Sequence, residues 1–207
     1  MPMIRRLVAL SFCCAVSAPA LALDEGPTFD CADPASQAEE AVCASPDLAA
    51  LDRELARLYD LAVQDPALSG ERLDELRAMQ RGWIKGRDAC WSSDLGLPTC
   101  VRNAYALRIH GLRGRYDGAR AEPGPSTGPF PYVCDGTPAL VSASFTQSGT
   151  PLAILTWTEG FAVLPLIPAA SGARYGEGET EFWTKGDEAT LTLRGQAPST
   201  CQRDDMG

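Results

Sequence analysis

The amino-acid sequence predicts an α+β protein made of two domains, a small disulfide-linked α-helical domain followed by an antiparallel β domain, either a barrel or a sandwich. Three observations support this fold class. Apolar residues recur at helical spacing through the first half of the chain. A segment rich in proline and glycine then interrupts the pattern. Short runs typical of β-strands, separated by turn residues, fill the remainder. The 207 residues are enough for two small domains.

The N-terminus has the organisation of a cleavable secretory signal over residues 1–22. Arg5 and Arg6 precede an apolar run, and small residues end the segment at Ala20-Leu21-Ala22. The apolar run is too short for a membrane-spanning helix. None of the N-terminal cysteines follows small residues in the way that lipidation requires. We therefore expect a periplasmic or secreted protein without a membrane anchor.

The chain is acidic, with a formal net charge of −9 at pH 7. Loss of Arg5 and Arg6 with the signal brings the net charge to −11. Nucleic acids and anionic lipids are polyanions, so this charge disfavours both as partners. It suits a basic protein partner, although acidity also serves solubility alone.

Six cysteines remain after the signal, an even number that predicts three disulfides in an exported chain. Fifteen pairings are formally possible. Pairing between local neighbours favours Cys31–Cys43 and Cys90–Cys100, and Cys134–Cys201 would then close the second half. No C-x-x-C motif occurs, and His110 is the sole histidine. These facts argue against a zinc or thioredoxin-type site, so we expect neither a metal nor another cofactor.

The helical pattern extends over residues 23–118. Asp33-Pro34 and Ser45-Pro46 each have a capping side chain followed by proline, the arrangement typical of a helix start. The helix from Pro46 is expected to end at Pro66, and Ser69 to cap the next helix.

A last helix follows Cys100 and carries several arginines: Arg102, Arg108, Arg113 and Arg115. We expect these arginines to form a solvated face, with a partner surface as the alternative. His110 lies on the same helix and is expected at the surface or at a helix end.

Residues 119–131 are so rich in proline and glycine that we expect a semi-extended linker rather than a helix or central strand. Residues 132–207 contain short β runs, which cover 132–134, 140–145, 152–157, 161–166, 174–177, 181–184 and 189–193. Seven or eight strands at this spacing predict an antiparallel barrel or sandwich.

Motifs of the first half resemble a known family. They are F-D-C ending at Cys31, A-x-C ending at Cys43, S-P-D-L-A-A-L-D-R-E-L from Ser45, Q-R-G-W-I-K-G-R-D-A-C ending at Cys90 and C-V-R-N-A-Y from Cys100. Over residues 29–116 they resemble the LprI N-terminal family, a helical, disulfide-linked envelope domain named for a lysozyme-inhibiting mycobacterial lipoprotein. The resemblance is specific for fold and less so for activity, because the family is broad.

Two motifs of the second half resemble another family. S-G-A-R-Y ends at Tyr175, and ten residues after Tyr175 comes the lysine of F-W-T-K-G. The pair resembles the signature of the MliC/PliC family of bacterial envelope inhibitors of c-type lysozyme. Ala169-Ala170 stands where that family often has another Ser-Gly. The resemblance implies a small antiparallel barrel with Cys134 and Cys201 at its closing disulfide positions.

The same resemblance implies which residues bind lysozyme: Ser171, Gly172, Ala173, Arg174, Tyr175, Trp183, Lys185 and Gly186. Ser171 would donate a hydroxyl toward the catalytic acid of the enzyme, and Lys185 would supply an ammonium. Gly172 would let the loop approach closely, while Tyr175 and Trp183 would brace the two loops. Because Phe182 and Trp183 alternate along a strand, one faces inward, and we expect Trp183 to be in the core.

The sequence leaves two alternatives to a lysozyme inhibitor that occludes the active-site cleft. Ser171 and Lys185 are also ordinary turn residues, and the helical domain alone would suit a non-inhibitory envelope scaffold that binds other exported proteins. An enzyme is disfavoured, because the sequence has no Ser-His-Asp order, no H-E-x-x-H and no cysteine-nucleophile pattern. We therefore assign no catalytic residue.

Overall fold

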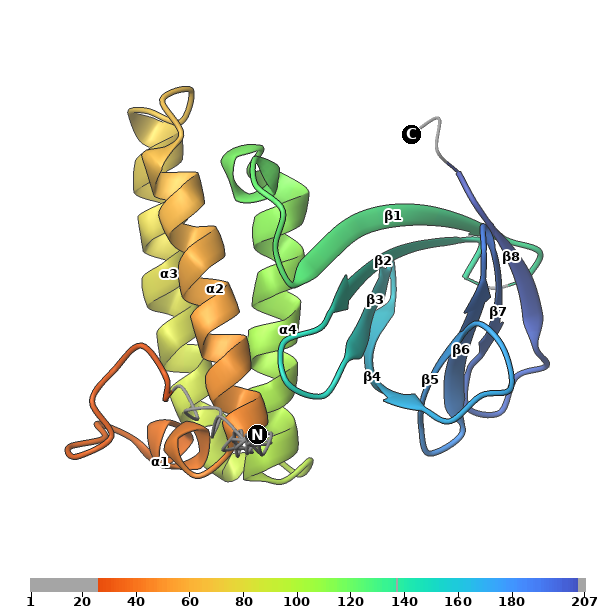
Figure 1. Cartoon of the computed structure of the whole chain (residues 1–207), viewed down its shortest axis with the longest axis horizontal. Coiled ribbons are helices and arrows are strands. Elements are labelled where there is room, and N and C mark those ends of the chain that lie inside the picture. Colours follow the sequence, from red (N-terminus) through yellow and green to blue (C-terminus); the bar gives the residue numbers. More distant parts are fainter. Residues whose placement is uncertain (1–25, 137, 205–207) are drawn as a thin grey trace, which may run out of the picture.

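The computed structural model describes residues 26–136 and 138–204. It places four α-helices in the first half and an eight-stranded antiparallel barrel in the second (Figure 1). The predicted α+β fold class and its order along the chain are confirmed. The predicted signal, residues 1–22, lies outside the described residues.

The helices begin at small residues that cap them or turn the chain. Ser36 and Ser45 accept hydrogen bonds from main-chain N–H groups of the first helical turn. The first helix thus begins after Ser36 rather than at Asp33, and the third follows Gly70 rather than Ser69. The helices are α1 Gln37–Cys43, α2 Pro46–Gln64, α3 Glu71–Asp88 and α4 Leu97–Arg115, with short 3-10 turns η1 Ala89–Ser92 and η2 Gly118–Arg120.

The strands follow one another around the barrel, and the last pairs with the first. Each neighbouring pair is antiparallel, so short hairpin connections suffice throughout. The strands are β1 Ser126–Cys134, β2 Leu140–Thr146, β3 Leu152–Trp157, β4 Gly160–Ile167, β5 Ala173–Glu177, β6 Thr180–Lys185, β7 Glu188–Thr192 and β8 Ser199–Arg203.

The segment expected to be a linker differs from the prediction, because β1 already begins at Ser126. Its prolines fit a strand for two reasons. Pro129 lies in an irregularity of the ladder, between Thr127 and Phe130. The Pro131 carbonyl faces away from β2 and accepts from the Asp204 N–H at 2.9 Å, beyond the end of β8, so its missing N–H costs no ladder bond.

The three predicted disulfides are confirmed: Cys31–Cys43, Cys90–Cys100 and Cys134–Cys201. The first two link neighbouring segments of the helical half. The third joins β1 to β8, the two strands that close the barrel.

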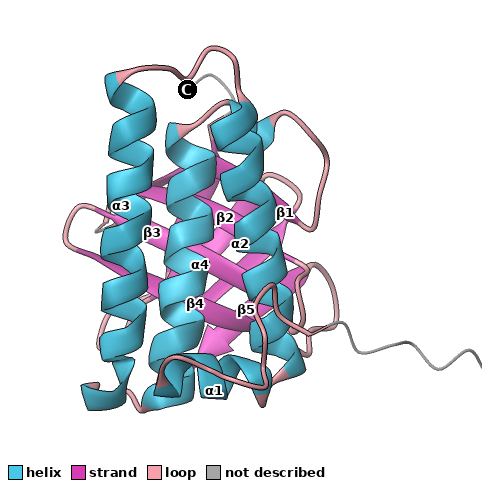
Figure 2. Cartoon of the chain, turned by 90° about the vertical axis from the view of Figure 1, so that its left-hand side faces the viewer, coloured by secondary structure: helices cyan, strands magenta, loops and turns pink. Residues whose placement is uncertain are grey.

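One core is shared between the helices and the barrel. Leu152, Ile154 and Val163 point outward from β3 and β4 and pack with the buried side chains of the helices. The barrel interior forms a second cluster, centred on Phe182 and Leu155. Figure 2 shows α4 between α2 and α3, in front of the strands. Within residues 26–136 and 138–204, no helix has both the length and the apolar character needed to cross a membrane.

This packing corrects the expectation of a solvated basic face on the last helix. Arg108 and Arg113 are buried. Arg113 donates to the Gly128 carbonyl at 2.9 Å, in the part of β1 that passes α4. His110 is half-buried rather than at the surface. Its ring nitrogens lie 2.9 Å from the Ser144 hydroxyl and 3.0 Å from that of Thr156, both on the barrel. The helical period did not reveal that the barrel covers the side of α4 with His110 and Arg113, or that α3 covers Arg108.

Candidate functional site

The two predicted loops meet at one shallow depression on the barrel. Ser171 comes from the β4–β5 connection, and Lys185 ends β6. Both side chains are exposed. The depression has a volume of about 200 Å³ and is lined by Ser171, Trp183, Lys185, Glu188, Ala189, Thr190 and Thr200.

Trp183 joins the two loops from the outside of the barrel. The sequence expectation that it lies in the core is wrong, because Trp183 is 37% exposed whereas Phe182 is fully buried. Phe182 pairs with Tyr175 on the inward face, so its neighbour must face outward. The Trp183 Nε1–H donates to the Ser171 carbonyl at 2.9 Å and thereby holds the serine loop against β6.

Gly172 permits this close approach. Its φ is +70°, a conformation that favours glycine. A Cβ at this position would lie 2.2 Å from the Thr184 carbonyl oxygen, which belongs to the main chain of β6. A side chain here would therefore push the serine loop away from the lysine strand.

Arg174 supports the tryptophan from the other side. Its guanidinium lies 5.5 Å from the centre of the Trp183 ring and pairs with Glu181 at 2.6 Å. Ala173 pairs with Thr184 across β5 and β6. These contacts fix the orientation of the tryptophan relative to Ser171.

Tyr175 and Gly186 shape the site without lining the depression. Tyr175 is buried in the barrel beside Phe145, with ring centroids 5.5 Å apart, and so anchors β5. Burial also raises the pKa of Tyr175 above its ordinary value. Gly186 has a φ of +64° in the turn after Lys185, and this turn leaves the lysine side chain exposed.

Sequence reasoning missed four residues of the depression: Glu188, Ala189, Thr190 and Thr200. Glu188 is opposite Lys185 in the β6–β7 hairpin, and Thr190 and Thr200 face each other across β7 and β8. Lys185-Gly186 stands between the predicted strands 181–184 and 189–193, so a hairpin there would place Glu188 beside the lysine. The contribution of β8 had no comparable signal, because it depends on barrel closure.

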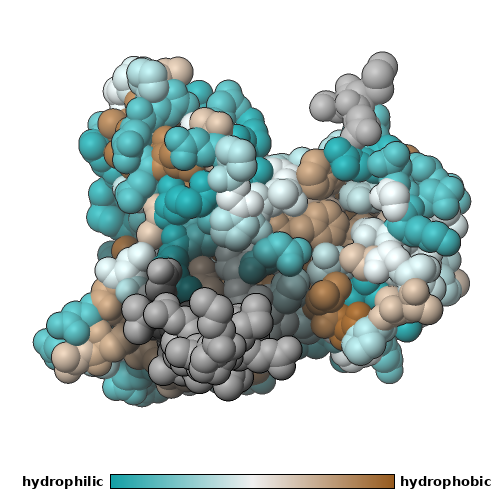
Figure 3. Space-filling view, viewed as in Figure 1, coloured by the Kyte–Doolittle hydropathy of each residue, from teal (hydrophilic) through white to brown (hydrophobic). Residues whose placement is uncertain are grey.

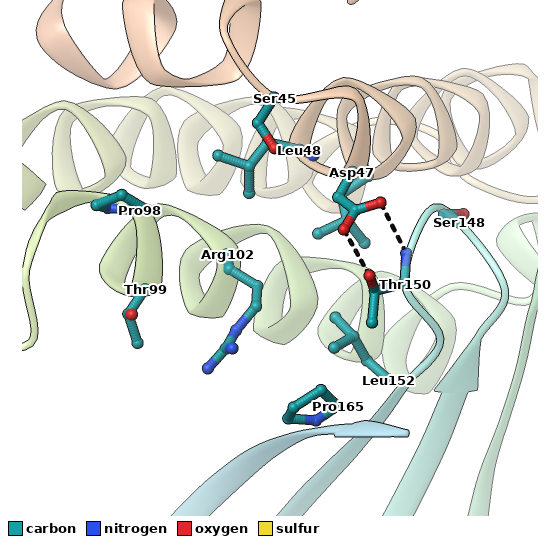
Figure 4. Close-up of a pocket in the computed structure, with 11 residues that line it drawn as sticks. Ser45, Asp47, Leu48, Pro98, Thr99, Arg102, Ser148, Thr150, Leu152 and Pro165 are labelled. Atoms are coloured by element: carbon teal, nitrogen blue, oxygen red, sulfur yellow. Dashed lines mark hydrogen bonds between the residues drawn. The ribbon is translucent and has the colours of Figure 1, made fainter. Parts of the chain in front are cut away.

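A second pocket, of about 210 Å³, lies where the helices meet the barrel (Figure 4). Here Asp47 at the start of α2 accepts from the Thr150 N–H at 3.0 Å and the Thr150 hydroxyl at 2.5 Å. Gly149 allows the contact, since a Cβ there would lie 2.7 Å from the Asp47 Cα. Arg102 of α4 also pairs with Glu177 of β5 at 2.7 Å. These contacts hold the barrel in one orientation on the helices.

The depression with Ser171 and Lys185 is on strands that the helices leave free. The principal helix–barrel contacts involve β1, β3 and β4, whereas the depression is formed by β6, β7 and β8 and the serine loop (Figure 1). Figure 3 shows hydrophobic and hydrophilic areas side by side over the barrel half. The large exposed apolar side chains of the barrel include Phe161 and Leu166.

Family comparisons match each half separately. Residues 31–110 match the family described as lysozyme inhibitor LprI. Residues 132–200 match the family described as membrane-bound lysozyme-inhibitor of c-type lysozyme, a range that contains the whole candidate site.

Individual relatives match over different lengths of the chain. Lipoprotein LprI of Mycobacterium tuberculosis is 32% identical over 186 residues, which cover 88% of each chain. The membrane-bound lysozyme inhibitor of C-type lysozyme of Cupriavidus necator is 37% identical over 90 residues, 42% of this chain and 65% of that protein. A crystal structure of Pseudomonas aeruginosa MliC in complex with hen egg white lysozyme also matches. The matched chain is 29% identical in sequence, the match covers 41% of this chain and 91% of that chain, and the TM-score is 0.32.

Proposed function

Because this chain belongs to the LprI family of lysozyme inhibitors, we propose that it inhibits c-type lysozyme by placing the Ser171 and Lys185 loops in the active-site cleft. The observation that carries this proposal is geometric. A hydroxyl and an ammonium from separate loops line one exposed depression, on strands that the helices leave open.

The chemistry of the target explains why these two groups suffice. Lysozyme cleaves its substrate with a pair of carboxyl groups, one acting as the acid and the other as nucleophile or stabiliser. The Ser171 hydroxyl suits a hydrogen bond to the acid, and the Lys185 ammonium suits an ion pair with its partner. Both contacts strengthen when the complex excludes water from the cleft.

The loops are held in place before any encounter. Trp183 ties the serine loop to β6 through its 2.9 Å hydrogen bond, and Gly172 lies against the main chain of Thr184. Little loop entropy is therefore lost on binding. Since c-type lysozymes are basic, the net charge of −11 left after export also favours their encounter.

We further propose that residues 1–22 are removed on export to the periplasm or medium, and that no lipid is attached. The helices would form one domain, and the strands from Ser126 onward the inhibitory barrel. Mass spectrometry of the exported protein tests this, since cleavage after Ala22 without added acyl mass is expected.

The decisive experiment is a titration of hen egg white lysozyme with the mature protein. We expect stoichiometric inhibition by the wild type. Lys185→Ala is expected to weaken binding by about 2–4 kcal/mol, the range for removal of one member of a buried charged pair. Lys85→Ala is the matched control. Lys85 is an exposed residue of α3 in the helical half, and this variant should bind as the wild type does. Full lysozyme activity at equimolar micromolar protein would overturn the proposal, as would unchanged binding by Lys185→Ala.

A further inference from the structure

A groove between α3 and α4 in the helical half is separate from the lysozyme site. It has a volume of about 440 Å³, and it opens to solvent at Gly86 and Arg115, both exposed. Figure 2 shows the two helices side by side. Three apolar side chains and three arginines share its walls: Met79, Trp83, Leu107, Arg87, Arg108 and Arg115.

Arg87 has its positive charge fully matched. It is 4% exposed, and its Nη2 donates to Glu39 at 2.9 Å and to Asp88 at 2.8 Å. Its Nη1 donates to the Tyr105 hydroxyl at 3.0 Å, and its guanidinium lies 5.4 Å from the centre of the Trp83 ring. This arginine needs no further partner.

Arg108 in the same groove is 7% exposed but lacks such partners. Its Nε donates to the Gln80 side-chain oxygen at 2.9 Å. Its Nη2 is buried without a hydrogen-bond partner, and no ion pair reaches the residue within the described ranges 26–136 and 138–204. Burial lowers the pKa of Arg108, partly opposed by the nearby Tyr116 and Tyr59 hydroxyls. A buried cation without a counter-charge is costly, and a bound anion would offset that cost.

Arg115 adds a second positive charge at the rim of the groove. It is exposed, and the contact of its guanidinium is with the Met79 sulfur at 3.4 Å rather than with a carboxylate. An unmatched buried guanidinium beside an exposed one makes a local anion-attracting surface on an otherwise acidic protein.

We propose that this groove binds the C-terminal carboxylate of a peptide whose last residue is apolar. A carboxylate fits the planar fork of a guanidinium. Met79, Leu107 and the Trp83 ring would contact the apolar side chain. A guanidinium fork also fits phosphate, but bare phosphate has no apolar part to contact Met79, Leu107 and the Trp83 ring.

Two glycines offer a way to close the groove without damaging the fold. A Cβ added at Gly86 or at Gly111 meets no heavy atom within 4 Å, and both glycines line the groove. Replacement of a glycine inside a helix by leucine also favours the helical conformation. Gly111→Leu should therefore fill the groove while the thermal unfolding midpoint stays equal or rises.

The test is calorimetric titration of the full mature protein with N-acetyl-Gly-Gly-Leu and with the same peptide as its C-terminal amide. We expect the free acid to bind at least about tenfold more tightly than the amide, because only the acid forms a charge-assisted pair. Equal affinities, or no binding of the acid at millimolar concentration, would overturn the proposal. Sodium octanoate that binds more tightly than the peptide would also overturn it, in favour of a fatty acid.

Variants then place the binding in the groove. Arg115→Gln should lower the affinity for the free-acid peptide several-fold, and Gly111→Leu should abolish its binding. Lys85→Gln, on the same pair of helices, should leave the affinity unchanged. Binding that survives in Gly111→Leu would exclude the groove. Lysozyme inhibition should be equal in all three variants, so that failure of this proposal is distinguishable from failure of the inhibitor assignment.

Discussion

The helical half and the barrel half bury different chemistry. The charged residues that are buried within the described chain all come from the helices: Asp52, Glu54, Arg87, Arg108 and Arg113. The polar residues buried in the barrel are small hydroxyl side chains: Ser126, Ser144, Thr146 and Ser148. Buried charge requires defined partners, so the helical half depends on pairing geometry, whereas the barrel depends on apolar packing.

The helical network illustrates this dependence. Asp52 accepts from the Thr28 N–H and hydroxyl, both at 2.7 Å, and from the Tyr105 hydroxyl at 2.8 Å. Tyr105 in turn accepts from Arg87, which reaches Glu39. The network therefore ties the segment before α1, α1 itself, α2, α3 and α4 together.

The charged side chains of the barrel lie at its surface, where a partner protein can contact them. Lys185 and Glu188 are exposed at the depression, and the Arg174–Glu181 pair lies at the surface beside Trp183. The Arg87 network thus serves stability in the helical half, whereas the exposed charges of the barrel serve the proposed recognition of lysozyme.

Removal of a buried helical charge should have the largest effect. Arg87→Met is expected to cost about 3–5 kcal/mol of unfolding free energy, because Glu39 and Asp88 lose a buried cationic partner. Arg174→Gln in the barrel is the control and should leave the urea midpoint unchanged. Comparable losses in the two variants would contradict the division between the halves.

The shared core gives the second test. Ile154→Ala removes a fully buried side chain that the barrel contributes to the helical core, and about 2–4 kcal/mol should be lost. Phe161→Ala, an exposed residue of the neighbouring strand β4, should have little effect. Circular dichroism and tryptophan fluorescence should report one unfolding transition. Two separate transitions in the wild type would show that the halves are independent.

His110 should make stability depend on pH. Burial lowers its pKa below the ordinary value of 6.5, so between the two values the unfolded chain binds more protons than the folded chain. The contribution of neutral His110 to the free energy of unfolding is present above the pKa that the group has in the unfolded chain. It is lost as the pH falls through the lower pKa that the group has in the folded chain. Urea midpoints at pH 7.5 and 5.5 should therefore differ more in the wild type than in His110→Gln. An identical difference in both proteins would rule out this role.

The smallest predicted effect concerns the rate of lysozyme association. Glu188→Gln removes one negative charge beside Lys185, and we expect association to slow about twofold at low salt. The difference should disappear at high salt through screening. Glu75→Gln, an exposed acid on α3, is the distant control. Stopped-flow fluorescence measures both rates, and faster association of Glu188→Gln would reverse the assigned role of this charge.

Local patterns predicted much of the fold. Ser45-Pro46 fixed the start of α2, and the six cysteines paired with their expected partners. Other predictions failed where the reason was not local. Trp183 faces outward because Phe182 fills the interior, and residues 126–131 form a strand because β2 is long enough to pair with them.

The sequence by itself determined the two classes of structure, their order and the loop motifs that carry Ser171 and Lys185. These depend on residue spacing, turn chemistry and cysteine proximity, all of which act over a few residues. Only the tertiary structure decided that the two loops share one depression, that Thr200 joins them, and that His110 is half-buried against the barrel. These outcomes depend on barrel closure and on docking of the helices against β3 and β4, contacts between segments far apart in the chain.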